Sequence, residues 1–209
     1  MVFRTFEYGM FLLLAVAFAM VNMATAGDPD IISDIILPQN VTSVDGNFFT
    51  YTAMRSLVEA PSVKNFTVLK ASMNEFPALN GQSVSYAVLR FPGSSINPPH
   101  IHPRSAELLF LLYGFLEVGF VDTKNKLYTQ KMQAGDMFVF PKGVVHFQNN
   151  LYSDESALAV SAFGSANAGT VSIPGSVFTT GIGDVILAKA FKTDVTTIQK
   201  IKAGLTPKV

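Results

Sequence analysis

The sequence predicts an all-β protein, a sandwich or barrel of one domain, with short helices at its C-terminal end. Seven short candidate strands follow one another between residues 83 and 163, and most of the turns between them contain Gly, Asn or Asp. Runs such as 83–91 and 106–113 are rich in Val, Leu, Phe and Tyr. Regular short strands with such turns are typical of sandwiches and barrels. Apolar residues at helical spacing are absent before about residue 183.

Residues 1–26 have the pattern of a secretory signal peptide. Residues 11–21 form an unbroken apolar run, and residues 24–26 (Ala-Thr-Ala) make a small-x-small cleavage site. The alternative is a membrane anchor, but the run is shorter than the roughly 20 residues that a membrane-spanning helix needs. We therefore expect a secreted mature chain that begins at Gly27 and is not attached to a membrane.

The composition limits the partners of the mature chain. The sequence has 15 Lys+Arg and 15 Asp+Glu residues, and removal of the signal peptide takes one of each sign. Such a balanced chain gives no reason to expect nucleic-acid binding. Only 14% of the residues are charged and 49% are hydrophobic, which favours buried subunit contacts because obligate interfaces resemble a protein core. The chain has no cysteine, and therefore no disulfide.

Strands are expected where apolar and β-branched residues run between turn signals. Residues 65–73 are a short candidate ahead of the main group, Gly114 joins two of its strands, and residues 123–125 make a hairpin turn. The expected strands of the main group are 83–91, 106–113, 115–122, 126–133, 136–140, 144–149 and 156–163.

The C-terminal segment changes to a helical pattern. Residues 184–191 are good helix formers, residues 193–203 place apolar side chains at helical spacing, and Gly204 is a plausible C-cap. Helices this short are unstable alone. They are expected to pack on a neighbour, which is either their own barrel or another subunit.

The three histidines of the chain all lie between residues 93 and 150. On a strand, residues two apart point to the same face, so His100 and His102 are expected side by side. Glu107 follows five residues later, which requires a bend between them, and residues 103–105 are suited to it. His146 arrives from a later strand.

Each of these residues alone has an ordinary explanation. A single strand histidine is usually a surface or hydrogen-bonded residue, and a single glutamate is usually solvated. Three imidazoles and one carboxylate together supply four ligands and leave one or two positions for water or substrate. The spacing therefore predicts a divalent-metal site and leaves Mn, Fe, Zn, Ni and Cu open.

The same residues fit two known motifs. The first motif is G(X)5HXH(X)4E(X)6G, and the chain matches it except at the leading glycine, because Gly93 lies one residue too early. The second motif is G(X)5PXG(X)2H(X)3N, and the chain matches all of it. In these motifs the chain resembles the cupins, and the stretches NPPHIHPR (97–104) and DVILAKAF (184–191) are similar more narrowly to plant germins and germin-like proteins. The matching residues are His100, His102, Glu107 and Gly114, then Gly135, Pro141, Gly143, His146 and Asn150.

The resemblance implies an architecture. It is a single cupin (jelly-roll) β-barrel with an N-terminal extension over residues 27–182, followed by a helical segment, 183–209, that clasps the next subunit of a homohexamer. It also implies secretion into the extracellular space, the plant apoplast or cell wall. Germins typically carry a disulfide near the mature N-terminus, and this chain has Ile35 and Ile36 where a cysteine is expected.

The resemblance also implies an activity. Mn²⁺ would be bound by the three histidines and Glu107, and superoxide dismutation would produce hydrogen peroxide, linked to plant defence. The alternatives are oxalate oxidation, or a noncatalytic role in nutrient storage or auxin binding. Oxalate-oxidising germins hold their substrate with two asparagines. The first matches Asn97, and the second position is Ala87, which cannot donate a hydrogen bond.

Asn97 therefore has two interpretations. It orients a bound anion or water beside the metal, or it is a turn residue before Pro98. Two sequons, at Asn40 and Asn65, are candidate glycosylation sites of a secreted chain. Asn65 is favoured because the family often carries a sequon in this region.

Overall fold

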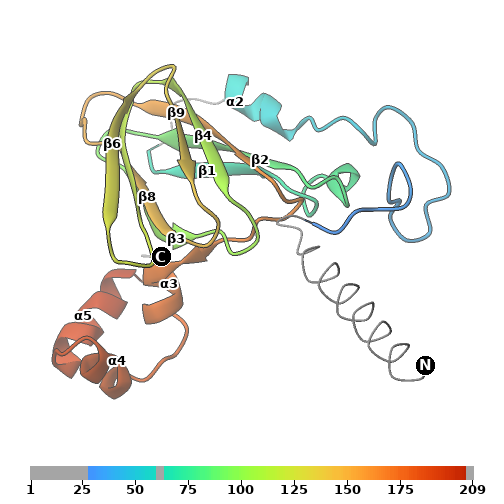
Figure 1. Ribbon diagram of the computed structural model, residues 1–209. Helices are drawn as coiled ribbons and strands as arrows, with labels where there is room; N and C mark the ends of the chain where they lie inside the picture. Colours follow the sequence, from blue (N-terminus) through green and yellow to red (C-terminus); the bar gives the residue numbers. More distant parts are fainter. Residues whose placement is uncertain (1–27, 60–63, 206–209) are drawn as a thin grey trace, which may run out of the picture.

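The computed structural model describes residues 28–59 and 64–205. In this part of the chain, ten strands form two five-stranded antiparallel sheets that face each other (Figure 1). The first sheet contains, in spatial order, β1 (Thr67–Ala71), β2 (Ser85–Phe91), β9 (Ala157–Phe163), β4 (Glu107–Tyr113) and β7 (Met137–Phe140). The second contains β10 (Val171–Ser172), β3 (Ile96–Ile101), β8 (Val145–Asn149), β5 (Phe115–Val121) and β6 (Leu127–Gln133). The predicted all-β jelly-roll class is confirmed.

The core lies between the two sheets. Because alternate strand residues point to opposite faces, one set of each strand is buried. Leu109 and Leu111 of β4 and Val118 of β5 are all 0% exposed, and Phe91 and Phe140 pack into the same cluster. One end of this core is apolar, and the inward positions at the other end carry polar side chains.

The predicted strands of the main group are present, but β3 was not among them. Its sequence contains Pro98 and Pro99, and prolines argue against a strand because they cannot donate to the ladder. The structure accommodates them in an irregularity: β3 pairs with β8 at Ile96, Asn97 and His100, and the register shifts between Asn97 and His100. The two prolines lie at this shift.

The structure contains short helices that the sequence pattern did not predict. Short helical turns, η1 (Ala53–Arg55), α2 (Ser56–Glu59) and η2 (Pro77–Leu79), precede the barrel or lie near its start, and α3 (Ile173–Phe178) comes before residue 183. The six residues of α3 include a proline and a glycine, which leaves no helical periodicity to detect. Helices α4 (Asp184–Ala190) and α5 (Val195–Leu205) match the predicted segment, but Gly204 lies inside α5 and is not its C-cap.

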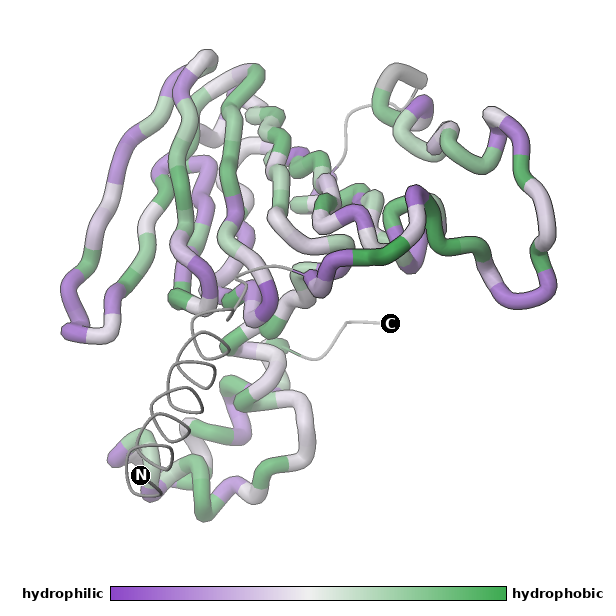
Figure 2. The backbone as a smooth tube through the Cα atoms, turned by 45° about the vertical axis from the view of Figure 1, so that its right-hand side comes forward, coloured by the Kyte–Doolittle hydropathy of each residue, from purple (hydrophilic) through white to green (hydrophobic). Residues whose placement is uncertain are grey.

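Helices α3 to α5, residues 173–205, form a helical arm that projects from one end of the barrel (Figure 1). Leu187, Ala188 and Ile198 are buried within the arm, packed against Val177 and Phe178. Other apolar side chains of the arm, among them Val185, Ile186 and Phe191, are exposed, and hydrophobic positions recur along its backbone in Figure 2. The arm therefore has a small core of its own and an apolar outer surface.

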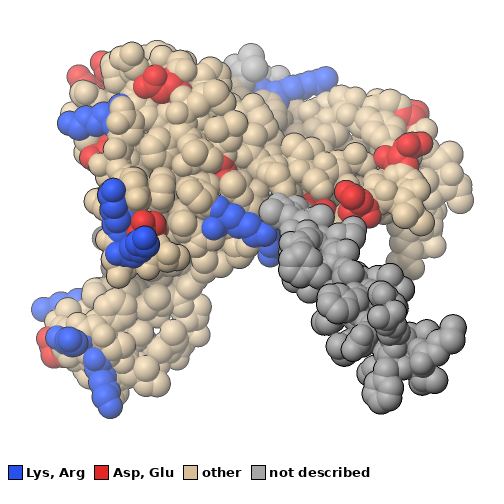
Figure 3. Space-filling view, viewed as in Figure 1, with Lys and Arg blue, Asp and Glu red and all other residues tan. Residues whose placement is uncertain are grey.

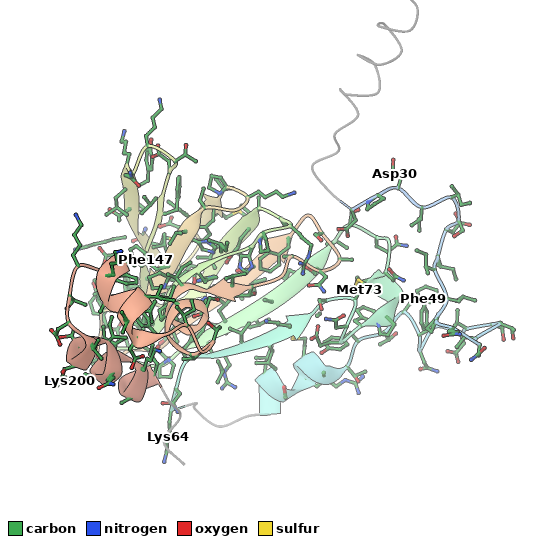
Figure 4. All side chains as sticks on the ribbon, turned by 90° about the horizontal axis from the view of Figure 1, so that it is seen from below. Asp30, Phe49, Lys64, Met73, Phe147 and Lys200 are labelled. Atoms are coloured by element: carbon green, nitrogen blue, oxygen red, sulfur yellow. The ribbon has the colours of Figure 1, made fainter. Side chains whose placement is uncertain are left out.

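The N-terminal segment, residues 28–50, lies at the opposite end of the molecule from the arm, as Asp30, Phe49 and Lys200 show in Figure 4. Asp28 fastens its beginning: Oδ1 accepts a hydrogen bond from Ser165 Oγ (2.6 Å) and Oδ2 accepts one from the Ala166 amide (2.5 Å).

Apolar packing holds the next part of the N-terminal segment. Ile31 and Ile36 pack so closely on Gly81 that a Cβ there would lie 2.4 Å from Ile31 Cγ2 and 2.9 Å from Ile36 Cδ1. Carboxylate hydrogen bonds and apolar contacts thus hold the region in which germins place a disulfide.

The predictions of a signal peptide, of no membrane attachment and of two glycosylation sites concern the N-terminus and the surface. The predicted signal peptide, residues 1–26, lies outside the described residues. Within residues 28–59 and 64–205, none of the helices has the length and hydropathy to cross a membrane. Asn40 and Asn65, the two sequon asparagines, are exposed. On the face shown in Figure 3, basic and acidic side chains are scattered among uncharged surface.

Candidate metal centre

Four side chains from three strands and a loop meet inside the barrel. His100 comes from β3, His102 follows that strand directly, Glu107 begins β4 and His146 comes from β8. One nitrogen or oxygen of each lies within 4.8 Å of those of the others. All four side chains are buried, with exposed fractions of 1–7%. The structure thus brings together the four residues that the sequence singled out.

Strand register explains this convergence. His100 lies directly opposite His146 in the β3–β8 pair, so both rings point to the same inner face, with centroids 4.1 Å apart. The chain then bends at residues 103–105 and crosses to the other sheet, where Glu107 opens β4. The carboxylate therefore faces the imidazoles across the barrel interior, and the predicted bend is confirmed.

Backbone carbonyls fix the orientation of all three rings. Nδ1 of His100 lies 2.8 Å from the Pro98 carbonyl oxygen, Nδ1 of His102 lies 2.5 Å from that of Gly169, and Nδ1 of His146 lies 2.9 Å from that of Val144. A carbonyl can only accept, so each Nδ1 carries the proton, and a neutral ring then presents the Nε2 lone pair. Metal-binding histidines in proteins are typically oriented in this way.

The arrangement of these acceptors fits a cation. Nε2 of His102 and Nε2 of His146 lie 3.0 and 3.1 Å from the same carboxylate oxygen, Oε2 of Glu107. Lone pairs and a carboxylate at such distances repel unless a proton or a metal ion lies between them. The donor set, three imidazole nitrogens and one carboxylate oxygen without thiolate, suits a divalent first-row metal.

Burial and mutual contact set the charge states. Burial and the neighbouring His146 lower the pKa of His100 to about 4, so this ring is neutral at neutral pH. Burial raises the pKa of Glu107, but the close contacts with the His102 and His146 rings outweigh this effect and lower that pKa to about 2. An ionised carboxylate and a neutral imidazole are the forms in which these side chains bind metals.

The second carboxylate oxygen of Glu107 has its own partners. Oε1 accepts a hydrogen bond from Ser161 Oγ at 2.6 Å and one from Gln148 Nε2 at 3.2 Å. Gln148 Oε1 in turn accepts one from Asn97 Nδ2 at 2.7 Å. Asn97 lies within β3 rather than in a turn. Sequence reasoning missed Ser161 and Gln148, although a serine in the middle of an apolar strand was a usable signal.

A cavity of about 410 Å³ opens beside three of the four residues, His100, His102 and Glu107. Its wall includes Ala87 and Asn97, the two positions that the resemblance to germins singled out, as well as Lys70 and Arg104. The side chain of Ala87 is 5% exposed and presents only a methyl group to the cavity. A small molecule in this cavity would therefore lie beside the metal ligands, and at position 87 it would contact a methyl group instead of the second asparagine amide that the resemblance implies for oxalate-oxidising germins.

Comparisons with known proteins place the chain in a family. The cupin family profile matches residues 59–199. Germin-like protein 9-3 of Oryza sativa subsp. japonica is 60% identical over 202 residues, which cover 93% of this chain and 94% of the relative. The chain is a germin-like protein of the cupin family. Germin-like protein subfamily 2 member 1 of Arabidopsis thaliana is 35% identical, over 94% of this chain and 96% of that relative.

Solved structures agree with this assignment. An oxalate oxidase superposes on this germin-like protein with a TM-score of 0.74 and 31% identity, covering 86% of this chain and 98% of that one. A structure of oxalate oxidase with the substrate analogue glycolate gives the same TM-score at 30% identity, with the same coverage. The predicted family is confirmed, and so is its barrel.

Proposed function

We propose that this germin-like protein is a secreted manganese protein with superoxide dismutase-like activity. Dismutation converts two superoxide ions and two protons into dioxygen and hydrogen peroxide. The observation that carries the proposal is the buried set of three histidines and Glu107 at a cavity whose wall has a methyl group, Ala87, in place of a second substrate-holding amide.

The metal would be held by the Nε2 atoms of His100, His102 and His146 and by Oε2 of Glu107. Oxygen and imidazole donors without thiolate fit manganese or iron, and the resemblance to germins favours Mn²⁺. When bound, the ion would supply a one-electron redox couple. The carbonyl hydrogen bonds keep the three imidazoles oriented, and burial between the sheets keeps bulk water from the ligands.

The charges around the cavity are compatible with an anionic substrate once a metal ion is bound. The charged side chains that line the cavity are Lys70, Arg104, Glu75 and Glu107, and a bound divalent ion would outweigh the single negative charge of Glu107, which would leave the cavity with a net positive charge. Clefts lined mainly by one sign of charge raise the local concentration of the opposite sign. Superoxide carries one negative charge and is small, so it needs few orienting groups.

Oxalate oxidation is the second candidate. It is favoured by the structural similarity to oxalate oxidases at 30–31% identity and by Asn97, which lines the cavity. It is disfavoured by Ala87, because one missing hydrogen bond to a charged group costs about 1.5–3 kcal/mol. A role in nutrient storage alone would leave the complete and buried ligand set without a purpose, and auxin binding would require an apolar cavity beside the metal.

Assembly into a homohexamer is part of the proposal. Val185 and Ile186 of the helical arm are 73% and 65% exposed, and on the outer face of the first sheet Met137 and Val139 are 58% and 55% exposed. Large exposed apolar side chains that lie next to one another, as in each of these two pairs, favour an interaction site. The arm projects from its own barrel (Figure 1), which favours clasping a neighbouring subunit over covering its own strands.

The proposal also covers the processing, location and glycosylation of the protein. A signal peptide, 1–26, is removed, and residues 27–182 form the barrel and its extension, with 183–209 as the oligomer-forming segment. The mature protein then resides in the apoplast or cell wall, glycosylated at Asn65 and Asn40. There, hydrogen peroxide from dismutation would contribute to plant defence.

The test uses the secreted, purified protein and measures metal content and superoxide dismutation on the same sample. We expect activity in proportion to manganese occupancy. His146→Ala is expected to lose both, because it removes one of four ligands, while circular dichroism still reports a folded β protein. Asp154→Asn, an exposed carboxylate outside the cluster, is the control. Full manganese occupancy without dismutation would refute the proposed reaction and make oxalate the next substrate to test.

A further inference from the structure

Oxygen Oε1 of Glu107 is the starting point, because it points away from the three imidazoles and is nevertheless fully engaged. Ser161 and Gln148 both donate to it, at 2.6 and 3.2 Å. Both donors are 0% exposed. Oε2, by contrast, has only the Nε2 atoms of His102 and His146 at 3.0 and 3.1 Å. The two oxygens of one carboxylate therefore have separate environments.

The first donor reaches Glu107 because of strand register. Ser161 lies in β9, directly opposite Ala87 of β2 and Leu109 of β4, so the three side chains point to the same inner face. Its neighbours in register are apolar, and a buried hydroxyl is costly unless it is hydrogen-bonded. Ser161 meets this requirement through Oε1 of Glu107.

The second donor is itself held in place. Asn97 lies opposite Gln148 in the β3–β8 pair, and its Nδ2 donates to Gln148 Oε1 at 2.7 Å. An amide presents an acceptor at one end and donors at the other. Fixing the acceptor end of Gln148 on Asn97 therefore aims its Nε2 donor at Glu107.

We propose that Ser161 and the Asn97–Gln148 pair are positioning residues that hold Oε1 of Glu107 from two sides, so that Glu107 binds the metal through Oε2 alone. This inference rests on the proposed metal-binding function. A carboxylate can bind an ion through one or both oxygens. Holding it to one oxygen keeps a coordination position for a small molecule from the cavity. Asn97 then acts through Gln148 rather than by touching the substrate.

The experiment compares Ser161→Ala with the unmodified protein, each stripped of metal and titrated with Mn²⁺. We expect Ser161→Ala to weaken Mn²⁺ binding about 10–100-fold, the usual effect of losing an outer partner of a metal ligand. The electron paramagnetic resonance spectrum of bound Mn²⁺ is expected to change because Glu107 gains freedom to offer both oxygens. Ser161→Thr keeps the hydroxyl and is expected to restore both values.

The matched control is Ser85→Ala. Ser85 is also a buried serine of the first sheet, 4% exposed, but its hydroxyl donates to the Ser165 carbonyl and not to Glu107. Its loss is expected to lower stability and to leave Mn²⁺ affinity and spectrum unchanged. Asn97→Ala, at a half-buried position, tests the Asn97–Gln148 pair on the other side of Oε1. It is expected to bind Mn²⁺ several-fold more weakly than the unmodified protein. It also tests the proposal if Ser161→Ala does not fold.

The outcomes separate the two proposals. An unmodified protein that binds Mn²⁺, with Ser161→Ala and Asn97→Ala equal to it in affinity and spectrum, overturns the positioning role and leaves the metal site standing. An unmodified protein that binds no Mn²⁺ overturns both. Loss of affinity in Ser161→Ala that Ser161→Thr restores supports the positioning role, because a purely structural serine would affect stability and not the bound ion.

Discussion

Ala87→Asn tests whether a single wall position separates this germin-like protein from oxalate oxidation. Ala87 is 5% exposed and lines the cavity of about 410 Å³ beside the metal ligands, so an asparagine there would place an amide donor within the space available to a substrate. A hydrogen bond to a charged group contributes about 1.5–3 kcal/mol. At about 1.4 kcal/mol for each factor of ten, oxalate should bind roughly 10- to 140-fold more tightly.

The assay is the dissociation constant of oxalate for the manganese-loaded protein, followed by carbon dioxide release from oxalate. Ala87→Leu is the matched control, because leucine has nearly the size of asparagine and no donor. Oxalate binding that is the same in Ala87→Asn and Ala87→Leu, at equal manganese content, would refute the reasoning that a missing hydrogen bond limits oxalate here.

Two further predictions concern acid stability and assembly. The unfolded state takes up a proton on His100 near pH 6.5 and the folded state only near pH 4, so the metal-free protein should lose about 3 kcal/mol of stability as pH falls through this window. Urea unfolding at pH 7 and pH 4 measures this loss, and equal midpoints would contradict the reasoning. Glu107, whose pKa is lowered from 4.5 to about 2, begins to lose its own contribution only at the acid end of this window, as pH falls from about 4.5 towards 2. Ile186→Asp, at an exposed apolar position of the helical arm, should reduce the size of the assembly in light scattering. The hairpin variant Thr123→Asp should not reduce it, and an unchanged mass in Ile186→Asp would exclude the arm as an interface.

Local patterns predicted the barrel well because most of its strands are short stretches of apolar and β-branched residues bounded by turn residues. Strand β3 was missed for the opposite reason: Pro98 and Pro99 argue against a strand, and only the shifted register with β8 makes room for them. Helix α3 is too short to show a period. For β3 the deciding contact, with β8, lies far away in the sequence.

The candidate site divides in the same way. His100, His102, Glu107 and His146 were recognisable because metal ligands follow a motif of fixed spacing. Ser161 and Gln148 belong to no such motif, and alternation tells only which face of a strand a residue occupies. Their partnership with Glu107 depends on which residues of three strands lie side by side, which a single sequence does not specify.

The anchoring of the N-terminal segment has a consequence for folding under reducing conditions. Asp28 hydrogen-bonds to Ser165 and Ala166, in the same loop as Gly169, whose carbonyl orients His102. In a protein stapled by a disulfide, thiol reagents or a reducing compartment would release this connection. Here the chain contains no sulfur that can be oxidised to a disulfide, so the segment, the loop and the ring of His102 assemble without an oxidant and are indifferent to the redox state of their surroundings.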